Sequence, residues 1–91
     1  MRQELTDWRA AIDVNDRQLV QLINIRARLA CELAKVKREL GVAMVDPTRE
    51  QEVVSLALQS NAGPLDDVAI TRIFESIIEE TRRVQTVHES A

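Results

Sequence analysis

The fold is decided by the stretch INIRARLACELAKVK, residues 23–37, in which apolar residues recur every three or four positions. This spacing is typical of one buried stripe along an α-helix. Arg26 stands where the next apolar residue belongs, and Lys37 follows eleven residues later. Eleven residues make about three helical turns, so both cations lie almost on the same face. The helix therefore carries two positive charges on the stripe that it should bury.

The same spacing continues in both directions, from about Glu4 to Leu40, without a glycine or a proline. Its steps of three and four alternate as in the heptad seam of packed helices. Gly41 then stands where a helix-terminating glycine is expected. The seam residues are Leu5, Trp8, Ile12, Asn15, Leu19, Leu22, Arg26, Leu29, Leu33, Val36 and Leu40. We therefore predict a first helix over about residues 4–40.

Two shorter helices are predicted after it. Asp46 is a suitable N-cap, so a second helix should run over about residues 46–59. A Gly-Pro turn separates it from a third helix, expected over about residues 66–88. The chain has only two aromatic residues and is 45% apolar. We interpret residues 1–91 as one all-α domain of three helices with an aliphatic core.

The length of the first helix predicts an assembly. A helix of about 37 residues is roughly 55 Å long, whereas a compact monomer of this size should measure about 30 Å across. Half of the helix would then lie outside such a monomer. The simplest cover is a second copy, so we predict a homodimer in which two long helices pack against each other. A helix bent or broken near Asn15 is the alternative.

Composition excludes several classes of protein. The net charge is −3 with acidic and basic residues interspersed, which argues against nucleic-acid binding, including by a helix-turn-helix, and against a polybasic membrane surface. Cys31 is the only cysteine and His88 the only histidine, so neither a disulfide nor a zinc site is expected. No apolar run approaches the roughly 20 residues of a membrane span, and MRQELTDW has no apolar signal core. We expect a soluble cytoplasmic protein.

Arg26 and Lys37 differ from most cations of the chain because no acid stands three or four residues away. An unpaired buried cation is costly, so an anion must meet it. One explanation is an ion pair with Glu50 or Glu52 of another helix, and a second is a polar residue that sets helix register, as Asn15 would. The third is a bound anionic ligand. Periodicity alone favours the ion pair over the ligand.

The third helix adds polar groups to its own apolar face. Thr81 and Gln85 follow Ile78 at steps of three and four, so a hydroxyl and an amide should face the core. An ordinary buried hydrogen bond would satisfy each of them. Together with the two cations of the first helix, they also suit the lining of a small polar pocket. Arg49 and Glu50, in the first turn of the second helix, would close this pocket.

These residues resemble the all-helical chorismate mutases over nearly the whole chain, from about Leu5 to Gln85. The resemblance is carried by the segments WRAAIDVNDRQLVQLINIRARLACELAKVK, DPTREQEV and ITRIFESIIEETRRVQ. It implies three helices per chain and two chains interlocked in a homodimer with two active sites. It also implies an isomerase that rearranges chorismate to prephenate in phenylalanine and tyrosine biosynthesis, with no metal and no other cofactor.

The resemblance also implies a role for each site residue. Arg26 and Lys37 match the cations that hold the substrate carboxylates, and Lys37 also reaches the ether oxygen. Gln85 matches a donor to the same oxygen, which makes these three the expected catalytic residues. Glu50 matches the acid that receives the ring hydroxyl, and Arg9 matches an arginine supplied by the other subunit. The remaining substrate-binding positions are Asp46, Arg49 and Thr81, the last of which falls where a serine is often found.

Helix geometry agrees with a second subunit at the site. Arg9 and Lys37 are 28 residues apart on one helix, a separation of about 42 Å. They cannot reach one small ligand from the same chain. A surface pair with Asp13 is the alternative for Arg9.

Three rival functions remain beside this interpretation. An isochorismate pyruvate-lyase or an aminodeoxychorismate mutase would share the arginine clamp, but a hydroxyl-accepting acid at Glu50 favours chorismate. A non-catalytic helical dimerisation or regulatory module would explain the heptads. It would not explain why two cations, a hydroxyl and an amide all face inward.

Overall fold

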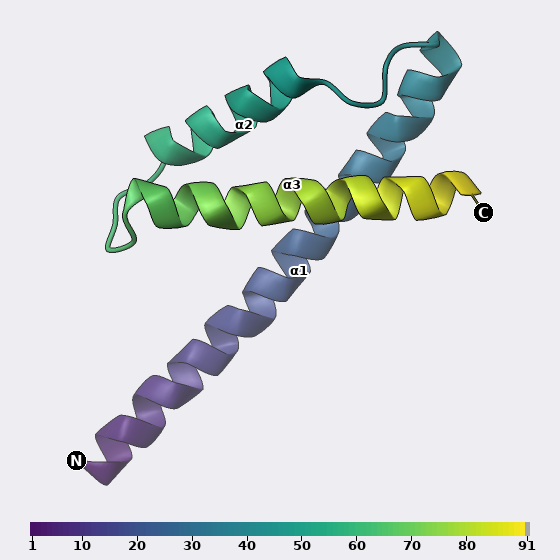
Figure 1. Ribbon diagram of the computed structural model, residues 1–91. Helices are drawn as coiled ribbons and strands as arrows, with labels where there is room; N and C mark the ends of the chain where they lie inside the picture. The colour runs from purple at the N-terminus through teal and green to yellow at the C-terminus, as the bar shows by residue number, and fades with distance from the viewer. Residues whose placement is uncertain (91) are drawn as a thin grey trace.

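The first helix of the molecule, α1, is one continuous rod. The computed structural model describes the backbone of residues 1–90 and the side chains of residues 1–87. In it α1 runs over Arg2–Leu40, so the alternative of a helix broken near Asn15 is wrong (Figure 1). The helix ends at Gly41, whose φ of 68° is left-handed and whose N–H donates to the Arg38 carbonyl at 3.2 Å. Glycine adopts this conformation without the strain that a Cβ atom brings.

The other two helices also begin and end within two residues of their predicted positions. They are α2, over Pro47–Gln59, and α3, over Asp67–Ser90. Each is preceded by a capping aspartate. Asp46 accepts a hydrogen bond from the Arg49 N–H at 3.1 Å, and Asp66 accepts one from the N–H three residues later at 2.8 Å. Such caps satisfy backbone donors that the start of a helix leaves without partners.

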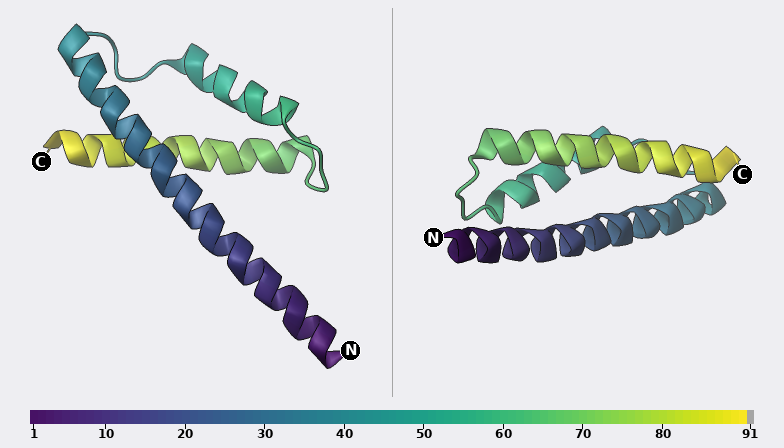
Figure 2. Two further views of the ribbon diagram at one scale, coloured as in Figure 1. Left: turned by 180° about the vertical axis from the view of Figure 1, so that it is seen from behind. Right: turned by 90° about the horizontal axis from the view of Figure 1, so that it is seen from below.

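The three helices form an open arrangement in which α3 contacts both α1 and α2. Figure 1 and the left view of Figure 2 show α3 crossing the C-terminal half of α1, whereas the N-terminal half extends beyond both other helices. The molecule measures 59 × 29 × 15 Å, and its Cα radius of gyration is 16.8 Å. A compact chain of this length would have a radius of gyration of about 12 Å. The long helix thus carries α2 and α3 at only one of its ends.

The apolar seam of α1 is largely exposed in the single chain. Among the side chains that the structure describes, Ala34 is the only fully buried apolar one. Trp8 is 66% exposed and Leu22 is 63% exposed. The further exposed residues of the seam are Leu5, Ile12, Leu19, Leu29, Leu33, Val36 and Leu40. The seam therefore lacks the apolar cover that a heptad pattern requires.

Within residues 1–90, no helix is both long enough and apolar enough to cross a membrane. The 39 residues of α1 would suffice in length, but charged residues stand throughout this helix.

Candidate active site

A pocket of about 290 Å³ lies where the C-terminal half of α1 meets the start of α2 and the C-terminal half of α3. Every predicted site residue except Arg9 lines this pocket. Those residues are Arg26, Lys37, Asp46, Arg49, Glu50, Thr81 and Gln85. Apolar side chains of all three helices fill the wall between them. The packing of α3 on α1 and on α2 thus gathers polar residues from distant parts of the chain.

Arg26 reaches from α1 to α3 inside the pocket. Its Nη1 donates to Thr81 Oγ1 at 2.9 Å, and the same hydroxyl donates to the Ile77 carbonyl at 2.7 Å. Arg26 and Thr81 are both half-buried. No carboxylate among the described side chains lies within ion-pair distance of Arg26. A guanidinium has several N–H donors, so the bond to Thr81 leaves further donors for an anion. The Thr81 hydroxyl is neutral, so it does not cancel the positive charge of Arg26.

The ion pair that periodicity favours for Arg26 is not formed, and this expectation is wrong. Glu50 pairs with Arg82, and Glu52 pairs with Arg49 at 3.2 Å. The Glu52 side chain is 59% exposed, and its partner lies three residues away on the same helix. The two acids of α2 are thus engaged by other arginines.

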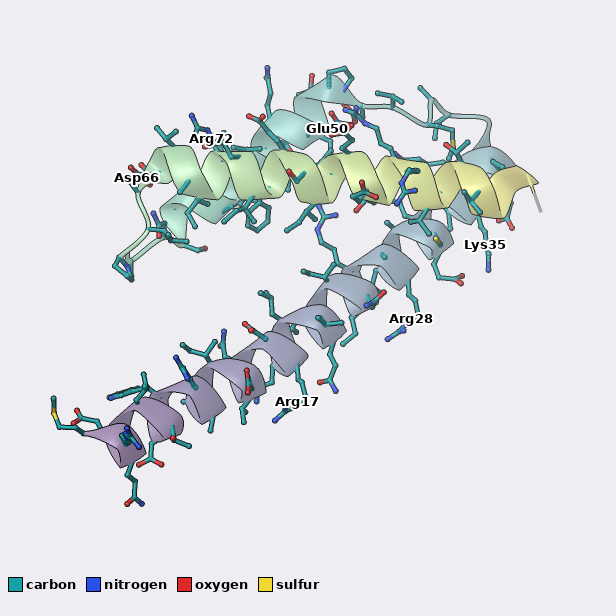
Figure 3. The ribbon with its side chains drawn as sticks, turned by 60° about the horizontal axis from the view of Figure 1, so that its bottom comes forward. Arg17, Arg28, Lys35, Glu50, Asp66 and Arg72 are labelled. Carbon is teal, nitrogen blue, oxygen red and sulfur yellow. The ribbon has the colours of Figure 1, made fainter. Side chains whose placement is uncertain are left out.

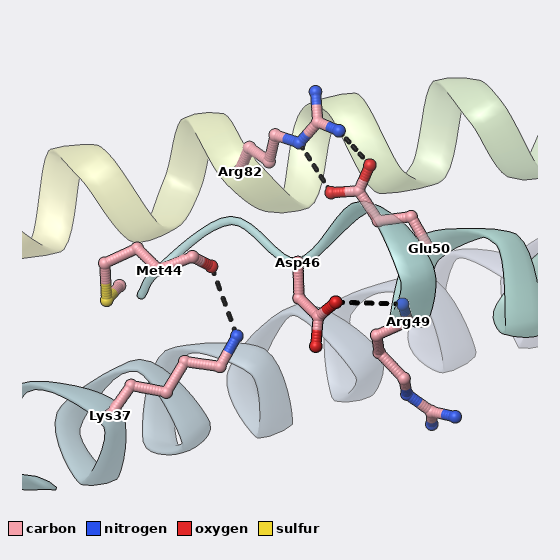
Figure 4. A network of polar contacts seen from close by, with 6 residues as sticks. All are labelled: Lys37, Met44, Asp46, Arg49, Glu50 and Arg82. Atoms are coloured by element: carbon pink, nitrogen blue, oxygen red, sulfur yellow. Dashed lines mark hydrogen bonds and ion pairs between the residues drawn. The ribbon is translucent and has the colours of Figure 1, made fainter. Parts of the chain in front are cut away.

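Lys37 lines the same pocket, eleven residues after Arg26 on α1. Its Nζ donates to the Met44 carbonyl at 3.1 Å, which ties the connection between α1 and α2 to the end of α1 (Figure 4). A carbonyl is neutral, and within residues 1–87 no carboxylate lies within ion-pair distance of the ammonium. An ammonium carries three donors, so this bond leaves others for a ligand.

Position on the helix separates these two cations from others of α1. Figure 3 shows Arg28 and Lys35 pointing away from α3. Lys35 pairs with Glu32 of the same helix at 2.9 Å, with both side chains more than half exposed. Such a pair is an ordinary feature of a solvated helix face. Arg26 and Lys37, by contrast, face a pocket.

Gln85 joins α3 to α1 beside the cations. Its Nε2 donates to the Ala30 carbonyl at 2.9 Å, and the residue is half-buried. An amide nitrogen carries two N–H donors, so one remains after this bond. Both Thr81 and Gln85 face inward, as their spacing predicts, because each is bonded to a residue of α1.

Asp46 and Arg49 border the pocket and are engaged by local contacts. The Asp46 carboxylate accepts the N–H of Arg49 and so caps α2 (Figure 4). The Arg49 guanidinium pairs with Glu52, and both of these side chains are 59% exposed. An exposed pair contributes only about 0–1 kcal/mol, so it does not prevent the guanidinium from turning into the pocket.

The pocket contains one further charged residue, Arg82, which periodicity does not single out. Its Nε donates to Glu50 Oε2 at 2.9 Å and its Nη2 donates to Glu50 Oε1 (Figure 4). A two-pronged contact of this kind fixes the plane of a carboxylate. In the sequence, Arg82 has Glu79 three residues before it, which is the pattern of a solvated surface pair. Only the packing of α3 against α2 reveals its contact with Glu50.

Arg9 lies outside the pocket. It is exposed and belongs to the half of α1 that extends beyond the other helices (Figure 1). Its alternative pairing with Asp13 is not formed among the described side chains. A single chain therefore does not bring Arg9 to the other site residues, as we expect from the 28 residues that separate Arg9 from Lys37 on one helix.

Comparison with known proteins identifies relatives along almost the whole chain. A family model described as chorismate mutase type II matches residues 8–86. The chain is 30% identical over 89 residues to the chorismate mutase of Methanocaldococcus jannaschii, which covers 93% of this chain and 87% of that protein. It is 38% identical over 82 residues to the bifunctional chorismate mutase/prephenate dehydratase of Pseudomonas aeruginosa, covering 85% of this chain. The chain spans only 22% of the length of that bifunctional relative.

Solved structures share the same fold. The structure of chorismate mutase (Form II) from Thermus thermophilus matches with a TM-score of 0.88 and 28% identity, over 91% of this chain and 94% of that one. Form I of the same protein matches with a TM-score of 0.83 and 29% identity, over 86% and 98% of the two chains. With a family model that covers most of its length, the chain belongs to the chorismate mutase type II family.

Proposed function

We propose that this protein is an isomerase that converts chorismate to prephenate, a step in phenylalanine and tyrosine biosynthesis. The observation that carries the proposal is the pair of cations, Arg26 and Lys37, which line one pocket. Among the described side chains, neither cation has a carboxylate within ion-pair distance. Chorismate carries two carboxylates, so it supplies the anions that these cations lack. The family to which the chain belongs supports the same reaction.

The chemistry suits a pocket made of fixed donors. The reaction is an intramolecular 3,3-shift, in which one C–C bond forms as one C–O ether bond breaks. The enzyme must hold the flexible enolpyruvyl arm over the ring, which is a positioning effect. It must also stabilise the negative charge that grows on the ether oxygen. Arginine suits the first task because its planar fork binds carboxylates through paired hydrogen bonds.

Each residue of the pocket receives a role in this proposal. Arg26, oriented by Thr81, binds a substrate carboxylate. Lys37 and Gln85 direct N–H donors at the ether oxygen, and a preorganised donor of this kind is worth roughly 3–4 kcal/mol in the transition state. Glu50 accepts a hydrogen bond from the ring hydroxyl. Asp46 and Arg49 complete the edge of the site.

The proposal includes a homodimer in which the partner subunit's Arg9 binds a carboxylate in the pocket. The exposed apolar seam of α1 supports it, because a second copy of the same helix would cover that seam. The extended shape supports it as well, with a Cα radius of gyration of 16.8 Å. Arg9 stands on the half of α1 that would enter the partner, so the same packing would bring it to the second pocket.

The proposal also places the enzyme in the cytoplasm. Cys31 is the only cysteine, so the chain has no internal disulfide, which suits a reducing compartment. Cell fractionation followed by immunoblotting tests this location, and a signal confined to a membrane fraction would contradict it.

The reaction is tested by following substrate and product with the purified protein. We expect prephenate to appear in the same molar amount as chorismate disappears, measured by ultraviolet absorbance and by nuclear magnetic resonance. Isochorismate and aminodeoxychorismate are supplied in parallel. Release of pyruvate from isochorismate, without turnover of chorismate, would identify a lyase instead. A folded dimer that leaves all three compounds unchanged would identify a non-catalytic module.

A further inference from the structure

The contact between Arg82 and Glu50 joins α3 to α2 at the edge of the pocket (Figure 4). Both carboxylate oxygens of Glu50 are engaged by the guanidinium, in the forked geometry that carboxylates and arginines form most strongly. The Glu50 side chain is 27% exposed and that of Arg82 is 48% exposed. The acid is therefore the more enclosed partner, held in place by an arginine that reaches it from the outside.

This ion pair differs from the others in the described part of the chain. Each of the other three joins residues three apart in one helix, and in each of them both side chains are more than half exposed. Pairs of that kind contribute little and hold neither side chain firmly. The contact between Arg82 and Glu50 links residues 32 positions apart and lies on the wall of the pocket.

The location of Glu50 creates a competition for the cations of the site. Glu50 lines the same pocket as Arg26 and Lys37, and neither cation has a carboxylate partner among the described residues. Without a restraint, this carboxylate would be attracted toward these cations, because opposite charges attract more strongly in a half-buried site than in water. Asp46, the other acid of the pocket, is engaged by the N–H of Arg49.

We propose that Arg82 is a positioning residue: by holding both oxygens of Glu50, it keeps this acid from Arg26 and Lys37 and leaves both cations for a dicarboxylate substrate. The same grip presents Glu50 to the substrate hydroxyl, since a carboxylate has lone pairs beyond the two that Arg82 uses. This inference rests on the proposed function, because it concerns how the cations of the proposed site stay free of Glu50 and bind the carboxylates of the substrate.

The first test is the Arg82→Gln enzyme with chorismate as substrate. Freed Glu50 then competes with the substrate, so KM should rise by about tenfold, the scale of one charged hydrogen bond. The value of kcat should change less, because the competing pair is already broken in the bound complex. An unchanged KM in a folded Arg82→Gln dimer would overturn the proposal.

The decisive step is a double-mutant cycle with Glu50→Gln. If Arg82 acts by restraining Glu50, then Arg82→Gln should change KM by less than about twofold once the competing carboxylate is gone. If Arg82 instead binds the substrate directly, Arg82→Gln raises KM equally in both backgrounds, and the proposal fails.

A second variant, Arg82→Lys, keeps a cation but not the forked guanidinium, so it should raise KM less than Arg82→Gln does. If Arg82→Gln loses helicity by circular dichroism, the same cycle with Arg82→Lys decides between these outcomes.

The matched control is Arg83→Gln. Arg83 is the next residue of α3, pairs with Glu80 on the surface and does not line the pocket. Its replacement should leave KM and kcat unchanged. The wild-type enzyme separates the two proposals: absence of turnover by wild type contradicts the proposed function, whereas turnover with an unchanged KM for Arg82→Gln contradicts only the role of Arg82.

Discussion

Arg26 of α1 donates a hydrogen bond to the Thr81 hydroxyl of α3 at 2.9 Å, so the partner of this charged donor is a neutral acceptor. The hydroxyl itself donates to the Ile77 carbonyl at 2.7 Å, which directs its oxygen lone pairs toward the guanidinium. This contact orients the cation without neutralising it. A site for an anionic substrate requires that combination, because a cation already paired with a protein acid would bind the substrate weakly.

Removing the Thr81 hydroxyl should therefore weaken the reaction through Arg26. We predict that Thr81→Val, which keeps the shape of the side chain, lowers kcat/KM by about tenfold, the scale of one hydrogen bond to a charged group. Thr81→Ser keeps the hydroxyl and should stay near wild-type activity. Thr71→Val is the control, because the Thr71 hydroxyl makes the same kind of backbone bond, to Asp67, away from the pocket. Equal kcat/KM for Thr81→Val and wild type would contradict this role.

The amide of Gln85 predicts a flat pH profile. An amide donates a hydrogen bond at any pH, so kcat/KM should vary little between about pH 5 and about pH 8. In Gln85→Glu the carboxyl group donates only while it is protonated, so activity should fall as the pH rises and recover as it is lowered. The pH profiles of wild type and Gln85→Glu are both measured at chorismate concentrations below KM. A steep loss of wild-type kcat/KM across this range would count against Gln85 as the donor to the ether oxygen.

A composite active site predicts rescue between two inactive variants. If Arg9 acts in the partner's pocket, a mixed dimer of Arg9→Ala and Lys37→Ala chains contains one intact site and one doubly defective site. Refolding an equal mixture should therefore give about a quarter of wild-type activity, since half of the dimers are mixed. A mixture of Lys37→Ala and Arg26→Ala chains is the control, because both residues belong to one chain's pocket and no intact site can form. If the first mixture stays as inactive as its two components, Arg9 does not act in the partner's pocket; if Arg9→Ala alone is fully active, Arg9 lies outside the site.

The exposed seam predicts that a charge on it disrupts the assembly. Leu22 is 63% exposed in the single chain, so Leu22→Asp would be nearly harmless if the protein acted as a monomer. If a second copy covers the seam, the same change buries an unpaired charge and costs several kcal/mol. Light scattering should show wild type at twice the 10.3 kDa chain mass and Leu22→Asp largely dissociated or unfolded. Gln21→Asp, one residue away and off the seam, should remain dimeric. A wild-type protein of single-chain mass would contradict the dimer.

Local chemistry explains why the helices and part of the site could be predicted from the sequence. The seam of α1, the Asp46 cap and the terminating Gly41 are patterns that act within a few residues. A cation such as Arg26 stands out because it interrupts an apolar stripe, and Thr81 stands out for the same reason.

The partners of these residues could not be predicted, because they lie on other helices. Periodicity favours an ion pair between Arg26 and either Glu50 or Glu52. In the structure, Glu50 instead pairs with Arg82 of α3, and Glu52 pairs with Arg49. Arg82 sits among other charged residues, so no interruption of a pattern marks it. Arg9 is likewise selected only by family resemblance, since its partners would lie on a second chain.

Turnover of chorismate by the Lys37→Ala protein, beside wild type and Lys35→Ala, is the most direct test of a site built on unpaired cations. Lys35 is exposed and pairs with Glu32 on the same helix, so its loss should change kcat/KM by less than about twofold. For Lys37→Ala we predict a fall of about 10²–10³ in kcat/KM, the usual effect of removing one transition-state donor, with dimer mass and helicity unchanged. A folded Lys37→Ala dimer that rearranges chorismate at nearly the wild-type rate would contradict the proposed site.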